Sequence, residues 1–214
     1  MPKASIPMKT PTSTPMRNSG LDRRAAIGLG LAAVLMPRAA LALNDMQAKS
    51  LIARAVEDVN KAISSGKTGT ALYADFERIF VKYGDVPIIA RSALGAPARA
   101  ASAAQMAAFT KAFQGYLSRK YGKRFREFIG AKFEVAGARP VKTFYEVKTT
   151  AIFKGEAPFE VLWHVSDKSG QDRFFNLVIE GVNMLTLERS EIGAMLDKRR
   201  GDLDAMIGDL KKAG

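Results

Sequence analysis

The sequence predicts an α+β fold in which helices at both ends of the chain flank an antiparallel β-sheet. Before residue 130 and after residue 190, apolar residues recur at spacings of three and four, which is typical of amphipathic helices. Between these segments apolar and polar residues alternate, which is typical of strands with one buried face. The order of helices, meander and helices favours α+β over a parallel α/β arrangement.

The first 42 residues have the parts of a secretory signal. Arg23 and Arg24 precede the apolar run 25–36, and Ala40-Leu41-Ala42 forms a small-residue cleavage site. The run is too short to span a bilayer, which needs roughly 20 residues. We expect cleavage after Ala42. The arginine pair favours twin-arginine export, with ordinary secretion as the alternative. Residues 43–214 then form one domain.

Charge and cysteine content narrow the function. The chain has a formal net charge of +12, and residues 43–214 carry +7 of it. This charge favours anionic lipid headgroups or acidic proteins as partners, whereas export argues against nucleic acid. The sequence has no cysteine, so disulfides, thiol nucleophiles and thiolate metal sites are excluded.

Four helices are expected before the sheet, over residues 46–63, 71–83, 87–94 and 102–128. Gly66 and Gly69 end the first helix, and Pro87 suits the first turn of the third. Ser102 and Gln105 form a capping box at the start of the longest helix. The apolar face of that helix is bulky and consists of Met106, Phe109, Phe113, Tyr116, Leu117, Tyr121, Phe125 and Phe128.

The alternating segments predict strands over residues 132–135, 143–153, 159–166 and 173–179, followed by a short extended piece over 183–187. Turns are expected at 154–156 and 167–170. Two helices, over about 190–199 and 202–211, close the chain around Gly201.

The residues that could carry catalysis have simpler explanations. His164 is the only histidine and lies on the polar register of a strand, so an ordinary surface or rim position is the better interpretation. Asp167 and Asp172 bracket a turn, and Glu188 and Glu191 lie near a helix start, where the dipole favours negative charge. We therefore expect a protein that is not an enzyme and that has no metal and no cofactor.

The apolar helix and sheet allow two interpretations. They pack together as a filled core, which is the better interpretation for any single residue, or they stand apart and leave an apolar cavity. Composition and periodicity leave both open. Likewise, the basic run Arg119, Lys120, Lys123 and Arg124 is either a solvated helix face or a site for phosphate or an acidic partner.

Several segments share their order and spacing with a known family. They are residues 83–90, 94–95, 102–105, the positions Phe109, Phe113, Tyr116, Leu117, Tyr121, Val147, Thr149 and Val161, and residues 178–184, 188–192 and 201–203. In these segments the chain resembles the MlaC, or toluene-tolerance, family of periplasmic phospholipid-binding proteins. The run Arg173-Phe174-Phe175-Asn176 departs from the family, which often has a Trp-Lys-Val-like run there.

The resemblance implies a curved antiparallel sheet of four or five strands, with helices enclosing a cavity for acyl chains. By matching position, it implies that the cavity wall consists of Tyr83, Ile88, Ile89, Leu94, Phe109, Phe113, Tyr116, Leu117, Val147, Thr149, Val161 and Trp163, with Tyr121 deeper or at the rim.

The resemblance also implies a function and partners. The protein would be a periplasmic carrier of phospholipid cargo, acting as a monomer between an outer-membrane lipoprotein–porin complex and an inner-membrane ABC transporter with its substrate-binding ring. Three alternatives remain: a carrier of a hopanoid or sterol-like lipid, a small cone-fold enzyme for an apolar substrate, and a structural adaptor with a filled core.

Overall fold

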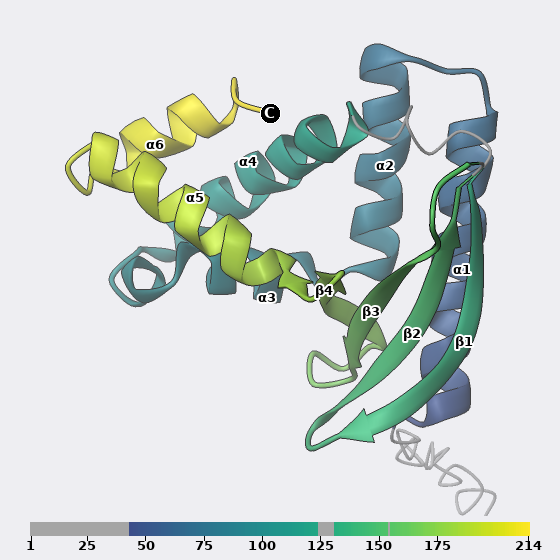
Figure 1. The fold of residues 1–214 in the computed structure, drawn as a ribbon. Coiled ribbons are helices and arrows are strands. Elements are labelled where there is room, and N and C mark those ends of the chain that lie inside the picture. Colours follow the sequence, from purple (N-terminus) through teal and green to yellow (C-terminus); the bar gives the residue numbers. More distant parts are fainter. Residues whose placement is uncertain (1–42, 124–130, 154) are drawn as a thin grey trace, which may run out of the picture. The chain divides into compact units, whose positions relative to one another are not determined.

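The structure is a computed structural model that describes residues 43–123, 131–153 and 155–214. Figure 1 shows an open sheet flanked by helices, which confirms the predicted α+β class. The helices are α1 (Asp45–Ser64), α2 (Gly69–Tyr83), α3 (Val86–Leu94), the 3-10 helix η1 (Ala96–Arg99), α4 (Ala103–Gly122), α5 (Met184–Lys198) and α6 (Leu203–Leu210). The strands are β1 (Lys132–Val141), β2 (Phe144–Ile152), β3 (Phe159–Ser166), β4 (Arg173–Ile179) and β5 (Val182–Asn183).

The sheet is a five-stranded antiparallel meander in the order β1-β2-β3-β4-β5. Its register pairs Thr149 with Val161 and Val147 with Trp163, so these residues share one face. On that face Val147, Thr149 and Val165 are fully buried. The alternation seen in the sequence therefore places the apolar side of the sheet against the helices. The long strands bend along their length in Figure 1.

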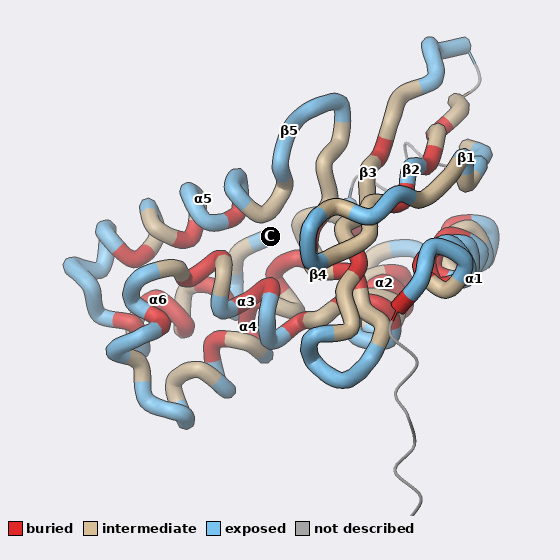
Figure 2. The backbone as a smooth tube through the Cα atoms, turned by 90° about the horizontal axis from the view of Figure 1, so that it is seen from below, coloured by how far each residue is buried: buried red, intermediate tan, exposed pale blue. Residues whose placement is uncertain are grey.

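The helices divide between the two ends of the sheet. Helix α1 packs on β1 and β2, whereas α3 and α5 contact β4. Helix α4 joins the two groups, because it packs on α2, α3 and α6. Buried residues gather where α3, α4 and α6 meet (Figure 2).

The helix starts follow the capping chemistry of the sequence. Ser102 and Gln105 form the predicted capping box of α4. Asn44 and Gln47 form a second capping box, at α1. The Asp85 side chain accepts a hydrogen bond from the Ile88 N–H, which caps α3.

Two predicted boundaries are wrong. Strand β1 continues to Val141, because a register shift between Val135 and Gly137 carries the chain past the point where the alternation breaks. The extended piece predicted over 183–187 is mostly helix. The Asn183 side chain accepts a hydrogen bond from the Thr186 N–H, so α5 begins at Met184. The part of the long helix predicted beyond residue 123 lies outside the described residues.

Candidate functional site

A cavity of about 260 Å³ lies between the buried face of the sheet and the helices. Its wall is almost entirely apolar and draws on every layer of the domain. From the helices come Ala55, Val59, Phe76, Ile79, Phe80, Ile89, Leu117, Ser118, Tyr121, Met184, Leu185 and Glu188. From the strands come Phe133, Phe159, Val161, Trp163, Phe174, Phe175, Asn176, Leu177 and Ile179.

Trp163 shows how the sheet side of the wall is held. Its indole Nε1–H donates to the Thr149 hydroxyl at 3.0 Å, and its ring packs edge-on against Phe174 with centroids 5.3 Å apart. Thr149 is fully buried behind the wall. Since the polar atom of the indole is satisfied within the sheet, the apolar ring is left to line the cavity.

Two wall residues, Tyr121 and Glu188, belong to a group of polar side chains between α4 and α5. The Tyr121 hydroxyl and the Lys120 ammonium both donate to Oε1 of Glu188, the latter at 2.7 Å. Lys120 also donates to Oε2 of Glu191 at 2.6 Å, and the Tyr116 hydroxyl donates to the same oxygen at 2.7 Å. We call these five residues the α4–α5 polar cluster.

Burial and neighbouring charges determine the protonation of Tyr116, Tyr121 and Glu191. Burial and the neighbouring carboxylates raise the pKa of Tyr116 and of Tyr121 well above the ordinary value, so both hydroxyls remain donors. Burial by itself would raise the pKa of Glu191, but the hydrogen bonds from Lys120 and Tyr116 outweigh it and hold that pKa below its ordinary value. Glu191 is therefore a carboxylate at neutral pH.

The site is an almost wholly apolar cavity between a bent antiparallel sheet and helices. The family model described as MlaC protein matches residues 50–212. The chain belongs to the MlaC family. Among solved structures, it is similar to the phospholipid-binding protein from Ralstonia solanacearum, solved in complex with a phospholipid. The TM-score is 0.65 with 19% sequence identity, over 76% of this chain and 98% of that chain.

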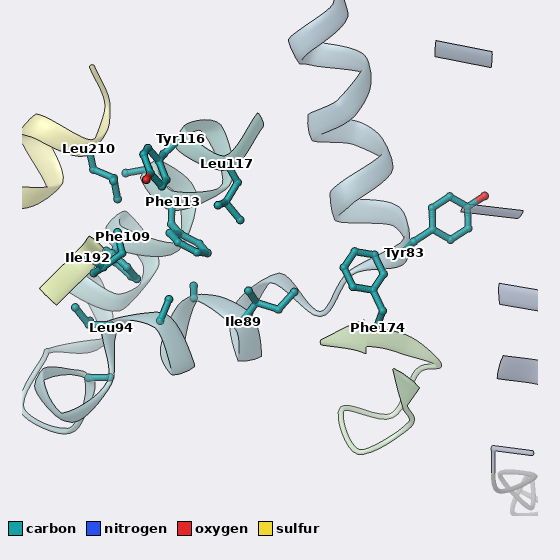
Figure 3. Packing of buried hydrophobic residues seen from close by; sticks show 14 of the residues in the cluster. Tyr83, Ile89, Leu94, Phe109, Phe113, Tyr116, Leu117, Phe174, Ile192 and Leu210 are labelled. Atoms are coloured by element: carbon teal, nitrogen blue, oxygen red, sulfur yellow. The ribbon is translucent and has the colours of Figure 1, made fainter. Parts of the chain in front are cut away.

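The structure places five of the thirteen residues expected in the wall at the cavity: Ile89, Leu117, Tyr121, Val161 and Trp163. Six others lie in the packed core: Leu94, Phe109, Phe113, Tyr116, Val147 and Thr149. Figure 3 shows Phe109 and Phe113 enclosed with Leu94, Ile192 and Leu210. Tyr83 is buried and its hydroxyl donates to Asp58 at 2.7 Å, while Ile88 is 44% exposed. Contact of these thirteen residues with a ligand stays a prediction.

Part of the cavity wall was missed in the sequence. Phe76, Ile79 and Phe80 stand on the apolar side of α2, and Phe159 shares a strand face with Val161. Their periodicity marked them as buried, but periodicity does not distinguish a core position from a cavity wall. Glu188 was explained as a helix-dipole partner, whereas α5 begins at Met184 and places Glu188 in its second turn, against the cavity.

The run Arg173-Phe174-Phe175-Asn176, where we expect a departure from the MlaC pattern, lies at the cavity. Phe174, Phe175 and Asn176 all belong to the wall. A register shift between β3 and β4 falls at this point. That these wall residues depart from the family pattern stays a prediction.

Three residues of the basic run, Arg119, Lys120 and Lys123, hydrogen-bond to other parts of the domain, and Lys123 is exposed. Arg119 donates to the backbone carbonyls of Leu210 and Ala213, both at 2.8 Å, and Lys123 donates to the Gly214 carbonyl at 2.6 Å. These contacts attach the C-terminal end of the chain to α4. Lys120 is held by the polar cluster, and Arg124 lies outside the described residues.

His164 lies on the opposite face of the sheet from Trp163, as the alternation predicts. It is more buried than a surface histidine, because its ring packs on Phe144 with centroids 4.7 Å apart. Burial lowers the pKa of His164 against the opposing effect of the nearby Glu146 carboxylate. His164 does not belong to the described cavity wall, although its ring bonds to the amide of Asn176, which does.

The described residues contain neither a metal-ligand group nor a membrane-spanning helix. In residues 43–123, 131–153 and 155–214, no group of three or more His, Cys, Asp or Glu side chains is arranged to hold a metal ion. Across that same part of the chain, no helix is both long and apolar enough to cross a membrane.

Proposed function

We propose that residues 43–214 form a periplasmic carrier that binds a phospholipid and moves it between the outer and inner membranes. The observation that carries the proposal is the almost wholly apolar cavity between the sheet and the helices. Membership of the MlaC family and the phospholipid bound to the similar Ralstonia protein support it. In this role the protein is a carrier and not an enzyme, and the lipid is its cargo.

The wall fits acyl chains physically. Burial of each CH₂ group is worth about 0.8 kcal/mol, so a diacyl lipid does not cross water unaided at a useful rate. Val161, Trp163 and Leu177 offer only carbon surface, apart from the indole N–H that Thr149 already accepts. This part of the wall shields tails without placing an unpaired polar group against them.

The two acyl chains of a phospholipid require more room than the cavity offers in this structure. About 260 Å³ lies just below the range of about 300–1,000 Å³ found for pockets of drug-sized ligands. We therefore propose that loading moves the helical part of the wall away from the sheet. A carrier whose site opens in this way also releases its cargo, because affinity is set by the population of the open form.

The cellular context is part of the proposal. Residues 1–42 would direct export, by the twin-arginine route, and would be removed after Ala42. The cargo would pass between an outer-membrane lipoprotein–porin complex and the substrate-binding ring of an inner-membrane ABC transporter, with the carrier acting as a monomer. The formal charge of +7 on residues 43–214 suits approach to anionic membrane surfaces.

Trp163 offers a direct test because it is the only tryptophan in the sequence and lines the cavity. Bromine atoms on acyl chains quench tryptophan fluorescence at contact. We expect residues 43–214, loaded from vesicles of dibrominated phosphatidylethanolamine, to lose most of the Trp163 emission seen with the unbrominated lipid. Equal emission in the two preparations would contradict binding of the tails against Trp163.

The identity of the cargo needs a second measurement. The protein purified from its own cells should carry a lipid with two acyl chains, detected by native mass spectrometry and identified after extraction. A hopanoid or sterol-like lipid in its place would support the alternative carrier. A preparation that is free of lipid and takes none from vesicles would overturn the proposal.

A further inference from the structure

Glu188 is a buried carboxylate with one oxygen left over. Its side chain is only 4% exposed, and it belongs to the wall of the cavity. Oε1 accepts hydrogen bonds from Lys120 and Tyr121, but Oε2 is buried and has no hydrogen-bond partner among the described residues. A buried acceptor without a donor is unfavourable in a folded protein, so a position of this kind calls for a partner.

The other polar groups of the described wall already have partners. The Ser118 hydroxyl donates to the Tyr73 carbonyl. The Asn176 amide bonds to the Leu185 N–H and to the His164 ring. Oε2 of Glu188 is thus the unpaired acceptor of the described wall, and a ligand would reach it when the wall opens on loading as proposed above.

The charge around this oxygen determines which ligand group suits it. The α4–α5 polar cluster holds two carboxylates and one ammonium, so it keeps one negative charge. Lys120 is engaged by both glutamates and lies near the rings of Tyr116 and Tyr121. An ionised phosphate oxygen has no proton to donate to Oε2, whereas a cationic N–H donor would gain a charge-assisted hydrogen bond.

The cluster also connects the cavity to the surface. Glu188 is buried, Lys120 is 23% exposed at its side chain, and Glu191 is 40% exposed. The polar groups therefore run from the cavity wall outward along α4 and α5. A lipid whose tails fill the apolar part of the cavity would place its polar end along this path.

We propose that Glu188 recognises an ammonium N–H of the lipid headgroup, as in phosphatidylethanolamine, by accepting it at Oε2. The assignment rests on the proposed lipid-binding function and adds a headgroup preference to it. A quaternary ammonium has no N–H, so a choline headgroup keeps the charge but cannot make this hydrogen bond.

A methylation series tests the proposal on the unmodified protein. Residues 43–214 are incubated with vesicles that contain equal amounts of dioleoyl phosphatidylethanolamine, its N-methyl and N,N-dimethyl derivatives, and dioleoyl phosphatidylcholine. Native mass spectrometry then counts each bound lipid. The first three keep an N–H, so we expect them to be bound at similar levels and the choline lipid about tenfold less. Equal binding of all four would overturn the proposal.

Two matched substitutions locate the effect. Glu188→Gln keeps the size of the side chain but removes its charge, so most of the preference against choline should vanish. Glu160→Gln removes the same charge from β3, where Glu160 pairs with Lys148 and does not belong to the described cavity wall, so the preference should remain. Equal loss in both variants would overturn the assignment to Glu188, because selectivity would then follow the net charge of the protein.

Failure of this inference and failure of the proposed function look different. Uptake of all four lipids at equal levels leaves the carrier function standing and removes the role of Glu188. Uptake of none of them by the unmodified protein removes the function itself. The methylation series decides the matter even if Glu188→Gln does not fold.

Discussion

The first half of α4 (residues 103–113) and its second half (residues 114–122) carry bulky apolar residues at the same helical spacing but have different surroundings. In the first half, Phe109 and Phe113 are fully buried and stack with ring centroids 5.6 Å apart. In the second half, Leu117 and Tyr121 line the cavity. Bulky residues at the same helical spacing therefore pack in a filled core in the first half and line a cavity in the second.

The difference lies in what faces the helix. The first half meets α3, α5 and α6, and helices that pack on one another interlock their side chains closely. The second half lies near the sheet, where Val161 and Trp163 stand on the far side of the cavity. Side chains fill the gap between helices in the first case and fail to fill the gap between helix and sheet in the second.

The largest expected effect comes from truncation in the filled half. Phe113→Ala should lower the free energy of unfolding by about 3–5 kcal/mol, because it leaves a large void in a close-packed core. Leu117→Ala, one turn later, should lower it by about 2 kcal/mol, since a side chain beside a cavity already lacks neighbours on one side. Urea denaturation measures both values, and equal losses would contradict the distinction between the two halves.

Strand β3 offers the same contrast with enlargement in place of truncation. Val161 lines the cavity, whereas Val165, two pleats along the same face, is fully buried outside the described wall. Val161→Phe should extend into the cavity, leave the thermal midpoint nearly unchanged and strongly reduce lipid uptake from vesicles. Val165→Phe should lower the free energy of unfolding by about 1–3 kcal/mol through overpacking, and its folded fraction should still take up lipid. A reversal of the two phenotypes would place the cavity elsewhere on the strand.

This contrast explains how far the sequence could predict the molecule. The helices, the meander and the capping box at Ser102 follow from local chemistry, which the sequence displays directly. Periodicity also marked Phe113 and Leu117 as buried, and both are. It could not indicate which of them faces a void, because a void depends on how elements distant in sequence fit together.

Two misjudged positions show the same limit. Thr149 was expected in the wall, but it is buried behind Trp163, whose indole N–H it accepts. Glu188 was explained by a helix start, but that start depends on the Asn183 cap, which the β-like run after residue 180 concealed. In both cases the decisive partner lies in another element or across an element boundary.

The smallest expected effect concerns the α4–α5 polar cluster, which joins the second half of α4 to α5. Hydrogen bonds from Lys120 and Tyr116 keep the pKa of Glu191 below its ordinary value in the folded protein. The unfolded chain therefore binds the proton more readily, and folding stability falls as the pH drops from the ordinary glutamate value through the lowered one. Above that window the contribution of Glu191 is fully present.

Glu191→Gln should accordingly weaken the loss of stability between about pH 5 and pH 3, while other acids keep the general decline. The measurement is the difference in thermal midpoint between the variant and the unmodified protein, followed across that window. The destabilisation caused by the substitution at pH 7 should shrink as the pH falls, because protonation removes the same carboxylate in the unmodified protein. A difference that stays constant with pH would show that Glu191 holds Lys120 and Tyr116 through geometry and not through charge. Packing and hydrogen-bond geometry, without a contribution from charge, would then hold α5 against α4 at Glu191.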